Sequence, residues 1–223
     1  RGESVPTTGT CREVRMSEEA IDGRTLRAQK ARETRRRQIL DAAIQVFAEK
    51  GYHQSSVSDL VQAAGVARGT FYLYFDGKSA IFHELLDELL GTLRSRVQGV
   101  DTNPGAPAIP LQLRTTLDRV LSTLSDNRAL CRILLREAVG LDEDVDAKLQ
   151  SFYEGLRRYI ESALQKGQDM GYVRDMDIEV AASCALGTVK EVVSRYLVRT
   201  DDEVDLETVA LGVLDFNLRG FVG

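Results

Sequence analysis

Proline is nearly absent from most of this chain, and that absence limits the folds it can adopt. Of the four prolines among 223 residues, Pro6 lies near the start and the other three fall in one short segment, residues 104–110. Proline interrupts a helix because it lacks an amide hydrogen and its ring clashes with the preceding turn. No segment alternates polar and apolar residues as a strand would. The sequence therefore predicts an all-α fold with long helices.

Apolar residues recur at the three- and four-residue spacing of buried helical faces. The first such pattern starts at about Arg32, runs through Ile39, Ala43 and Phe47, and stops before Gly51. Further patterns, bounded by glycine, proline and capping residues, bring the total to about nine helices. The predicted later ranges are 56–64, 68–74, 78–100, 111–125, 127–140, 142–167, 177–198 and 205–218.

Composition excludes several functional classes. Hydrophobic residues make up 43% of the chain, but no run of ~18 uncharged apolar residues occurs, and the start has no secretion signal pattern. Three widely spaced cysteines and two histidines offer neither a disulfide framework nor a metal-binding motif. We therefore expect a cytoplasmic protein with no cofactor, no metal site and no membrane partner.

Charge is distributed unevenly. The net charge is −5, yet residues 1–80 carry 13 Lys+Arg against 10 Asp+Glu, while the remainder carries 16 against 24. Seven basic residues lie between Arg24 and Arg37, with Glu33 as the only acid among them. A basic arm on an acidic body favours a polyanionic partner for one end, although a solvated helix start explains the same pattern.

The chain divides into three predicted regions. Residues 1–31 lack hydrophobic periodicity and are expected to form a disordered, basic N-terminal arm. Met16, followed by Ser17-Glu18-Glu19, indicates a natural start with residues 1–15 upstream of it. Residues 32–78 are expected to form a domain of short helices, and residues 79–223 a larger helical domain.

The predicted helices near residues 56–74 are joined by a glycine turn. In a helix-turn-helix the second helix enters the DNA major groove, and Gly65 can adopt the left-handed backbone that the turn needs. The surrounding stretch, from about Arg37 to Leu86, resembles the TetR family of transcriptional regulators. The residues that carry the resemblance are Gln38-Ile39-Leu40-Asp41-Ala42-Ala43, Phe47-Ala48-Glu49-Lys50-Gly51-Tyr52, Ser55-Ser56-Val57-Ser58-Asp59-Leu60, Ala63 to Phe75 and Lys78.

The resemblance implies a set of DNA contacts. Arg68, Gly69 and Thr70 would meet base edges, which arginine and the threonine methyl can read. The implied phosphate contacts are Ser55, Ser56, Tyr72, Tyr74 and Lys78. Arg37 completes the predicted DNA-binding set, although Arg32 and residues 35–37 could equally be a minor-groove arm or a solvated helix start. Ala67 stands where the family often has a capping Ser or Thr, so a weaker cap is expected.

The resemblance also implies that residues 32–78 are the helix-turn-helix DNA-binding domain and that residues 79–223 form an effector-binding and dimerisation domain, which builds a two-fold dimer. Candidate residues for a small, apolar or aromatic effector are Leu117, Leu121, Phe152, Tyr153, Leu156 and Cys184, each of which could be plain core instead. Helices apolar on more than one side must be buried on more than one side. The predicted homodimer contacts are Ala182, Ala185, Leu186, Val189, Val193, Tyr196, Val213 and Leu214; a monomer core is the alternative.

These features predict a regulator of transcription. The expected function is a repressor that leaves a pseudo-palindromic operator when an effector binds, with no enzyme activity. One alternative is an activator, or an architectural or cell-division DNA-binding protein, on the same scaffold. The other is a small-molecule carrier or enzyme, for which no catalytic motif was found.

Overall fold

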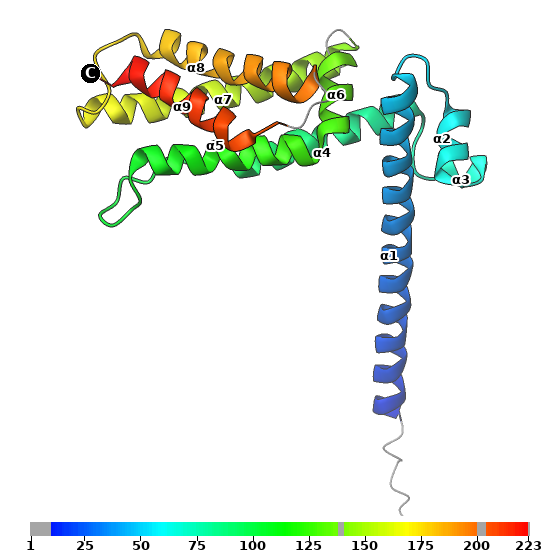
Figure 1. Ribbon diagram of the computed structural model, residues 1–223. Helices are drawn as coiled ribbons and strands as arrows, with labels where there is room; N and C mark the ends of the chain where they lie inside the picture. Colours follow the sequence, from blue (N-terminus) through cyan, green and yellow to red (C-terminus); the bar gives the residue numbers. More distant parts are fainter. Residues whose placement is uncertain (1–9, 138–140, 200–203, 223) are drawn as a thin grey trace, which may run out of the picture.

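A computed structural model describes residues 10–137, 141–199 and 204–222, and of residues 10–24 and 135–137 it describes the backbone alone. These residues form nine α-helices and no strand (Figure 1), which confirms the predicted all-α class. The helices are α1 (Thr10–Lys50), α2 (Val57–Ala64), α3 (Arg68–Tyr72), α4 (Lys78–Arg96), α5 (Ile109–Asp126), α6 (Arg128–Glu137), α7 (Glu143–Asp169), α8 (Ile178–Val193) and α9 (Leu206–Phe221).

The start of α1 differs from the sequence-based prediction. Helix was expected from about Arg32 after a disordered arm, whereas α1 begins at Thr10. Apolar periodicity shows where a helix is buried, and the side chains of α1 that the structure describes before Arg36, residues 25–35, are exposed. A helix without a buried face gives no such signal. The sequence has no proline between Pro6 and Pro104, so no proline prevents the helix from starting before Arg32. The predicted boundary at residue 31 therefore falls inside α1.

The second half of α1 forms a small helical head with α2 and α3 (residues 36–76). Its interior contains Phe47, Phe71 and Phe75, which are at most 3% exposed. Leu60 and Ala64 supply the buried side of α2. The head therefore holds its outward-facing side chains on a firmly packed base.

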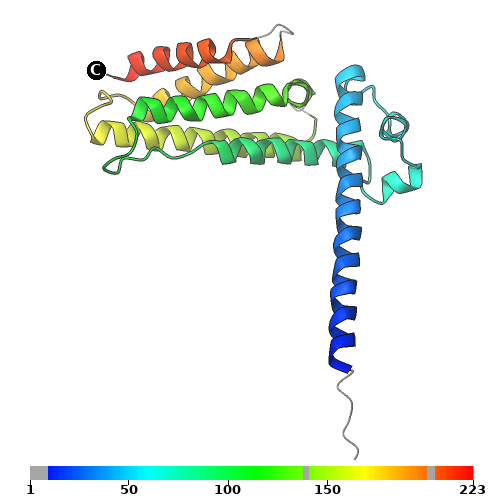
Figure 2. The same cartoon turned by 60° about the horizontal axis from the view of Figure 1, so that its bottom comes forward.

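Helices α4–α9 form the body, on the side of α1 away from α2 and α3 (Figures 1 and 2). Helix α7 packs on α8, α5 packs on α9 and α4, and α6 contacts α1. The predicted boundary between residues 78 and 79 lies at the start of α4, but one apolar cluster crosses it, from Ile39 in α1 through Phe82 in α4 to Ala210 in α9. The head and the body thus share one apolar core, to which α4 contributes.

The predicted helix over residues 177–198 is divided in the structure. Helix α8 ends at Val193, and Ser194–Val198 continue it as a π-helix that buries Leu197 and Val198. Widening the turn changes which side chains face the core, an effect that a regular helical period does not capture. No helix within the described ranges is long and apolar enough to cross a membrane.

Candidate nucleic-acid interface and ligand cavity

The start of α2 is fixed by a reciprocal cap. The Ser56 hydroxyl accepts a hydrogen bond from the Asp59 amide at 3.2 Å, while the Ser56 amide donates to the Asp59 carboxylate at 2.9 Å. Lys50, at the end of α1, donates to Asp59 at 2.5 Å. The bond from Lys50, and then those from Ser56, hold the pKa of Asp59 well below its usual range. Ser56 remains exposed at the helix start, where free amides favour an anion.

The turn between α2 and α3 has the geometry that the sequence predicted. Gly65 has φ +61° and ends α2 in the left-handed conformation. The Gln38 side chain of α1 donates to the Ala64 carbonyl at 2.7 Å, which ties the turn to α1. Ala67 makes no side-chain cap to α3, as expected from its methyl group. The orientation of α3 therefore depends on the turn and on its buried face.

Helix α3 turns Phe71 inward and carries the predicted base contacts on its outer surface. Phe71 is fully buried, whereas Arg68 and Gly69 are exposed and Thr70 is partly exposed. Tyr72 is 46% exposed, and its ring meets Phe71 edge-on. The structure thus brings Arg68, Gly69, Thr70 and Tyr72 together on one short, protruding element.

Two predicted phosphate contacts have other partners in this structure. Ser55 is buried, and its hydroxyl donates to the Tyr52 carbonyl at 2.7 Å. The Lys78 ammonium donates to the carbonyls of Tyr52, Ser55 and His53 at 2.7, 3.1 and 3.3 Å, and lies 4.4 Å from the Tyr52 ring centre. Three acceptors saturate an ammonium. Here Lys78 holds the loop between α1 and α2 instead of pointing to a phosphate, and Ser55 is inaccessible to one.

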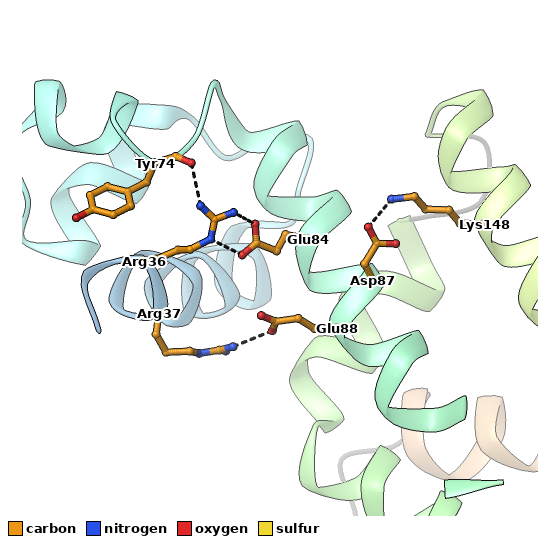
Figure 3. A network of polar contacts seen from close by, with 7 residues as sticks. All are labelled: Arg36, Arg37, Tyr74, Glu84, Asp87, Glu88 and Lys148. Atoms are coloured by element: carbon orange, nitrogen blue, oxygen red, sulfur yellow. Dashed lines mark hydrogen bonds and ion pairs between the residues drawn. The ribbon is translucent and has the colours of Figure 1, made fainter. Parts of the chain in front are cut away.

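Arg37, predicted to contact DNA, instead joins the head to the body. It pairs with Asp41 at 2.7 Å and with Glu88 of α4 at 2.8 Å. Figure 3 shows the neighbouring contacts, in which Arg36 binds Glu84 of α4 through two nitrogens and reaches the Tyr74 carbonyl at 3.4 Å. Tyr74 itself is only partly exposed. These pairs make α4 a bridge between α1 and the body.

The same helix is connected to α7. Lys148 pairs with Asp87 at 2.6 Å (Figure 3), and His83 Nε2 lies 3.1 Å from Asp142 Oδ2. Asp142 caps α7 by accepting from the Val145 amide, and this bond lowers the pKa of Asp142. The sequence alone does not give the partners in this network, although the acids of α4 at residues 84, 87 and 88 have the spacing of one helical face.

A large cavity of about 960 Å³ lies within the body. Helices α4, α5, α7, α8 and α9 line it, mainly with aliphatic and aromatic side chains. Four predicted effector residues line this cavity: Leu117, Phe152, Tyr153 and Leu156.

Two other predicted effector residues lie away from the cavity. Leu121 is fully buried in the core and Cys184 is exposed, and neither lines the cavity. A polar group at the cavity is Lys190 of α8, whose Nζ lies 3.9 Å from the ring centre of Tyr153. Arg94 lies 5.6 Å from the Phe152 ring. The cavity therefore combines a mainly apolar lining with a cationic group, Lys190, beside the aromatic ring of Tyr153.

The predicted dimer residues mostly face their own chain. Ala182, Ala185, Val193 and Val213 are at most 8% exposed within the single chain, and Leu186, Val189 and Leu214 line the cavity. Only Tyr196 of the predicted set is exposed. The outer face of α8 and α9 instead presents other apolar side chains: Val180, Leu211 and, at 70% exposure, Phe216.

Comparison with known proteins places these features in a family. A model described as bacterial regulatory proteins, tetR family, matches residues 39–85. The fatty acid metabolism regulator protein of Bacillus subtilis (strain 168) is 31% identical over 184 residues, which cover 82% of this chain and 93% of that protein.

Solved structures match over a similar length. The fatty acid degradation regulator FadR from Bacillus halodurans is 29% identical with a TM-score of 0.66, covering 83% of this chain and 95% of that one. FadR from Bacillus subtilis, in complex with stearoyl-CoA, is 27% identical with a TM-score of 0.64, covering 82% and 97%. The similarity therefore includes the body as well as the helix-turn-helix.

Proposed function

This chain belongs to the TetR family of bacterial transcriptional regulators, and we propose that it is a repressor released from its operator by an acyl-chain effector. The observation that carries this proposal is the joint presence of an outward-facing Arg68-Gly69-Thr70 tip and an apolar cavity of about 960 Å³ connected to it through α4. A bacterial operator lies in the cytoplasm, so this function assigns the protein to that compartment.

The chemistry of α3 suits the DNA major groove. Arginine donates two parallel hydrogen bonds to guanine, and a threonine methyl can touch the methyl of thymine. Gly69 has no other atom within 4 Å of the position a Cβ would occupy, so the surface there is open for close approach of the duplex. The Tyr72 hydroxyl and the amides at the Ser56 end of α2 are suitable donors to phosphate. These groups form the proposed DNA-contacting surface.

One short helix contacts few base pairs, so we propose that two copies act together. A two-fold dimer places its recognition helices in successive major grooves, about 34–36 Å apart or a multiple of that distance. The exposed apolar residues of α8 and α9, among them Phe216 and Leu211, mark the proposed dimer surface. Such a face is self-complementary in an isologous contact. The operator is then a pseudo-palindrome.

The proposed effector is amphipathic, with a long apolar chain and an anionic group. The cavity is at the upper end of the usual range for ligand pockets, and its lining excludes a strongly polar ligand. Lys190 lies where it can pair with an anionic group while the chain packs along Leu117 and Leu156. The Bacillus subtilis relative was solved with stearoyl-CoA, which has both features. We therefore assign a fatty acyl-CoA as the effector class.

Release from DNA requires that the effector prefer one arrangement of the heads. A ligand shifts a conformational equilibrium only by its difference in affinity for the two states. Leu89, Leu90 and Leu93 of α4 line the cavity, while Glu84 and Glu88 of the same helix bind Arg36 and Arg37 of α1. Filling the cavity can therefore displace α4 and, with it, the head.

Selection of bound fragments from random duplex DNA tests the DNA-binding part. The wild-type protein is expected to return a symmetric site, and Arg68→Ala to lose its preference for that site over scrambled DNA by about 1–3 kcal/mol with the fold intact. Arg158→Ala, on the exposed surface of α7, is the matched control and should behave as wild type. A wild-type protein without preference for any duplex would contradict the proposal.

The effector part is tested on the selected operator. Stearoyl-CoA is expected to release the DNA, whereas coenzyme A alone, which lacks the chain, is not. Lys190→Gln should raise the concentration of stearoyl-CoA needed for release while leaving operator affinity unchanged. A reporter gene under the operator then gives the direction of regulation, since its expression should rise when the regulator is deleted. Unchanged DNA binding at saturating stearoyl-CoA would exclude this effector class.

A further inference from the structure

Before it reaches the head, α1 projects from the molecule as a single helix. Figures 1 and 2 show this part extending beyond α2 and α3 with no other element beside its outer end. Every described side chain from residue 25 to residue 35 is exposed. The projecting segment (residues 25–35) contains Glu33 as its only acid, and its basic residues are Arg27, Lys30, Arg32 and Arg35.

The cations of the projecting segment lack the acidic partners that their neighbours have. Arg36 and Arg37, one turn further on, are paired with carboxylates of α4. Within the described part of the chain, no ion pair involves the four cations of the projecting segment, and Arg35 donates only to the Gln38 side chain at 2.8 Å. Like charges spaced three or four residues apart on a helix repel one another. An anionic partner would relieve this repulsion.

The projecting segment lies beside the end of α3, the proposed recognition helix. Arg32 and Arg35, together with Ala28 and Ala31, line a groove whose other wall is Leu73 and Tyr74, directly after α3. The small alanine side chains leave the groove open between the two arginines and the end of α3. The cationic side of α1 is thus continuous with the surface that the proposed function assigns to DNA.

We propose that the projecting segment is a second DNA-binding element that contacts the sugar-phosphate backbone flanking each half-site, through Arg32 and Arg35. This inference rests on the proposed function. Charge complementarity and continuity with α3 favour duplex DNA as the partner, and exposed guanidinium groups without a shaped pocket favour phosphates over bases. Eleven helical residues span about 16 Å. The contacts extend the protected DNA by up to about five base pairs beyond each half-site, at 3.4 Å per pair.

The test compares Arg32→Gln/Arg35→Gln with a control that loses the same charge elsewhere, Arg96→Gln/Arg158→Gln, in the body. Both control arginines are exposed and outside the described ion pairs. Each protein is titrated against the selected operator, either trimmed to its two half-sites or extended by ten base pairs on each side, from 50 to 200 mM salt. Circular dichroism and thermal unfolding confirm that all variants are folded.

Loss of four phosphate contacts per dimer is expected to reduce the slope of log affinity against log salt concentration by about 3–4. The arm variant, Arg32→Gln/Arg35→Gln, should therefore bind the extended operator at least about a hundredfold more weakly than wild type at 50 mM salt, and this difference should shrink as salt rises. Preference over scrambled DNA stays unchanged, since Arg68 is intact. The control keeps the wild-type salt dependence of binding. On the trimmed operator, the arm variant and wild type bind with equal affinity. The inference is overturned if the arm variant matches wild type on extended DNA, or if its loss is the same on trimmed DNA. Absence of any operator preference in wild type would instead refute the proposed function.

Discussion

Lys78 is a residue whose type and position are compatible with two different roles. Its sequence position implies a phosphate contact, whereas its ammonium donates to three carbonyls of the loop between α1 and α2. We predict that Lys78→Met lowers the free energy of unfolding by about 2 kcal/mol, since it removes charge-assisted hydrogen bonds from this loop. Denaturant unfolding measures this change. The salt slope of DNA binding should stay the same; unchanged stability with a slope smaller by about two per dimer would restore the phosphate role.

Cys131 is a buried thiol, and burial raises its pKa to about 12. Because the thiolate is the reactive form, we predict that iodoacetamide at pH 8 modifies Cys184, which is exposed, and leaves Cys131 unmodified until the protein unfolds. Mass spectrometry of a Cys11→Ser variant measures this difference. Rapid labelling of Cys131 in the folded protein would contradict its burial.

The same thiol makes stability depend on alkaline pH. An unfolded cysteine ionises near pH 8.5, while the folded Cys131 stays neutral to about pH 12. The raised pKa contributes stability that is complete below about pH 8.5 and is lost as pH rises toward 12. The denaturation midpoint should therefore fall over this window in wild type, and fall less steeply in Cys131→Ala. Parallel curves for the two proteins would show that the thiol does not titrate this way.

The turn between α2 and α3 requires a left-handed backbone at Gly65, and substitutions can distinguish this structural requirement from contact with DNA. Gly65 has φ +61°, and no atom lies within 4 Å of where its Cβ would be. Gly65→Ala therefore costs backbone strain without a clash, which we predict to be about 1 kcal/mol of stability. Thermal unfolding measures it. Gly69→Ala, in α3, is the comparison: it should leave stability equal or higher, yet weaken operator binding because the methyl meets the duplex.

In the proposed function, helix α4 couples effector binding in the cavity to the position of the head. Its acidic side chains allow this role to be tested. Glu84→Gln removes the carboxylate that binds Arg36. We predict that it changes the free energy of unfolding by no more than about 1 kcal/mol. Stearoyl-CoA should, however, weaken operator binding by a smaller factor in this variant than in wild type. Glu161→Gln removes a partner of Arg157 within α7 and is the control. An unaltered affinity ratio in Glu84→Gln would exclude this contact from the coupling.

The helices and the head were largely predictable, and the reasons are local. Gly65, Asp142 and the prolines of residues 104–110 mark helix ends through their own backbone and capping chemistry. What the sequence did not predict depends on surroundings. The first part of α1 has no periodic apolar signal in the sequence. Lys78 and Arg37 have partners that are distant along the chain, Tyr52 and Glu88.

At the scale of the whole molecule, a helix with two apolar faces is recognisable from sequence, but which face points inward is not. Ala182 and Ala185 were predicted at the dimer surface because their helix is apolar on more than one side, whereas in the structure both are buried within the single chain. The body requires small residues there for its own packing, since α7 packs on α8. The exposed candidates for the dimer surface are therefore Phe216 and Leu211.

If Phe216 lies in the dimer interface, replacing it should change the oligomeric state of the protein. Fully burying a large apolar side chain stabilises by about 1.5–3 kcal/mol, and a two-fold contact buries Phe216 twice. Phe216→Asp should weaken dimerisation by a hundredfold or more and also place two carboxylates near each other. Leu111→Asp, at an exposed apolar residue of α5, is the control and should stay dimeric. Sedimentation velocity distinguishes the two states. Since one head binds only one half-site, the Phe216→Asp monomer should also lose affinity for the full operator, whereas a dimeric Phe216→Asp variant with normal affinity would move the interface elsewhere.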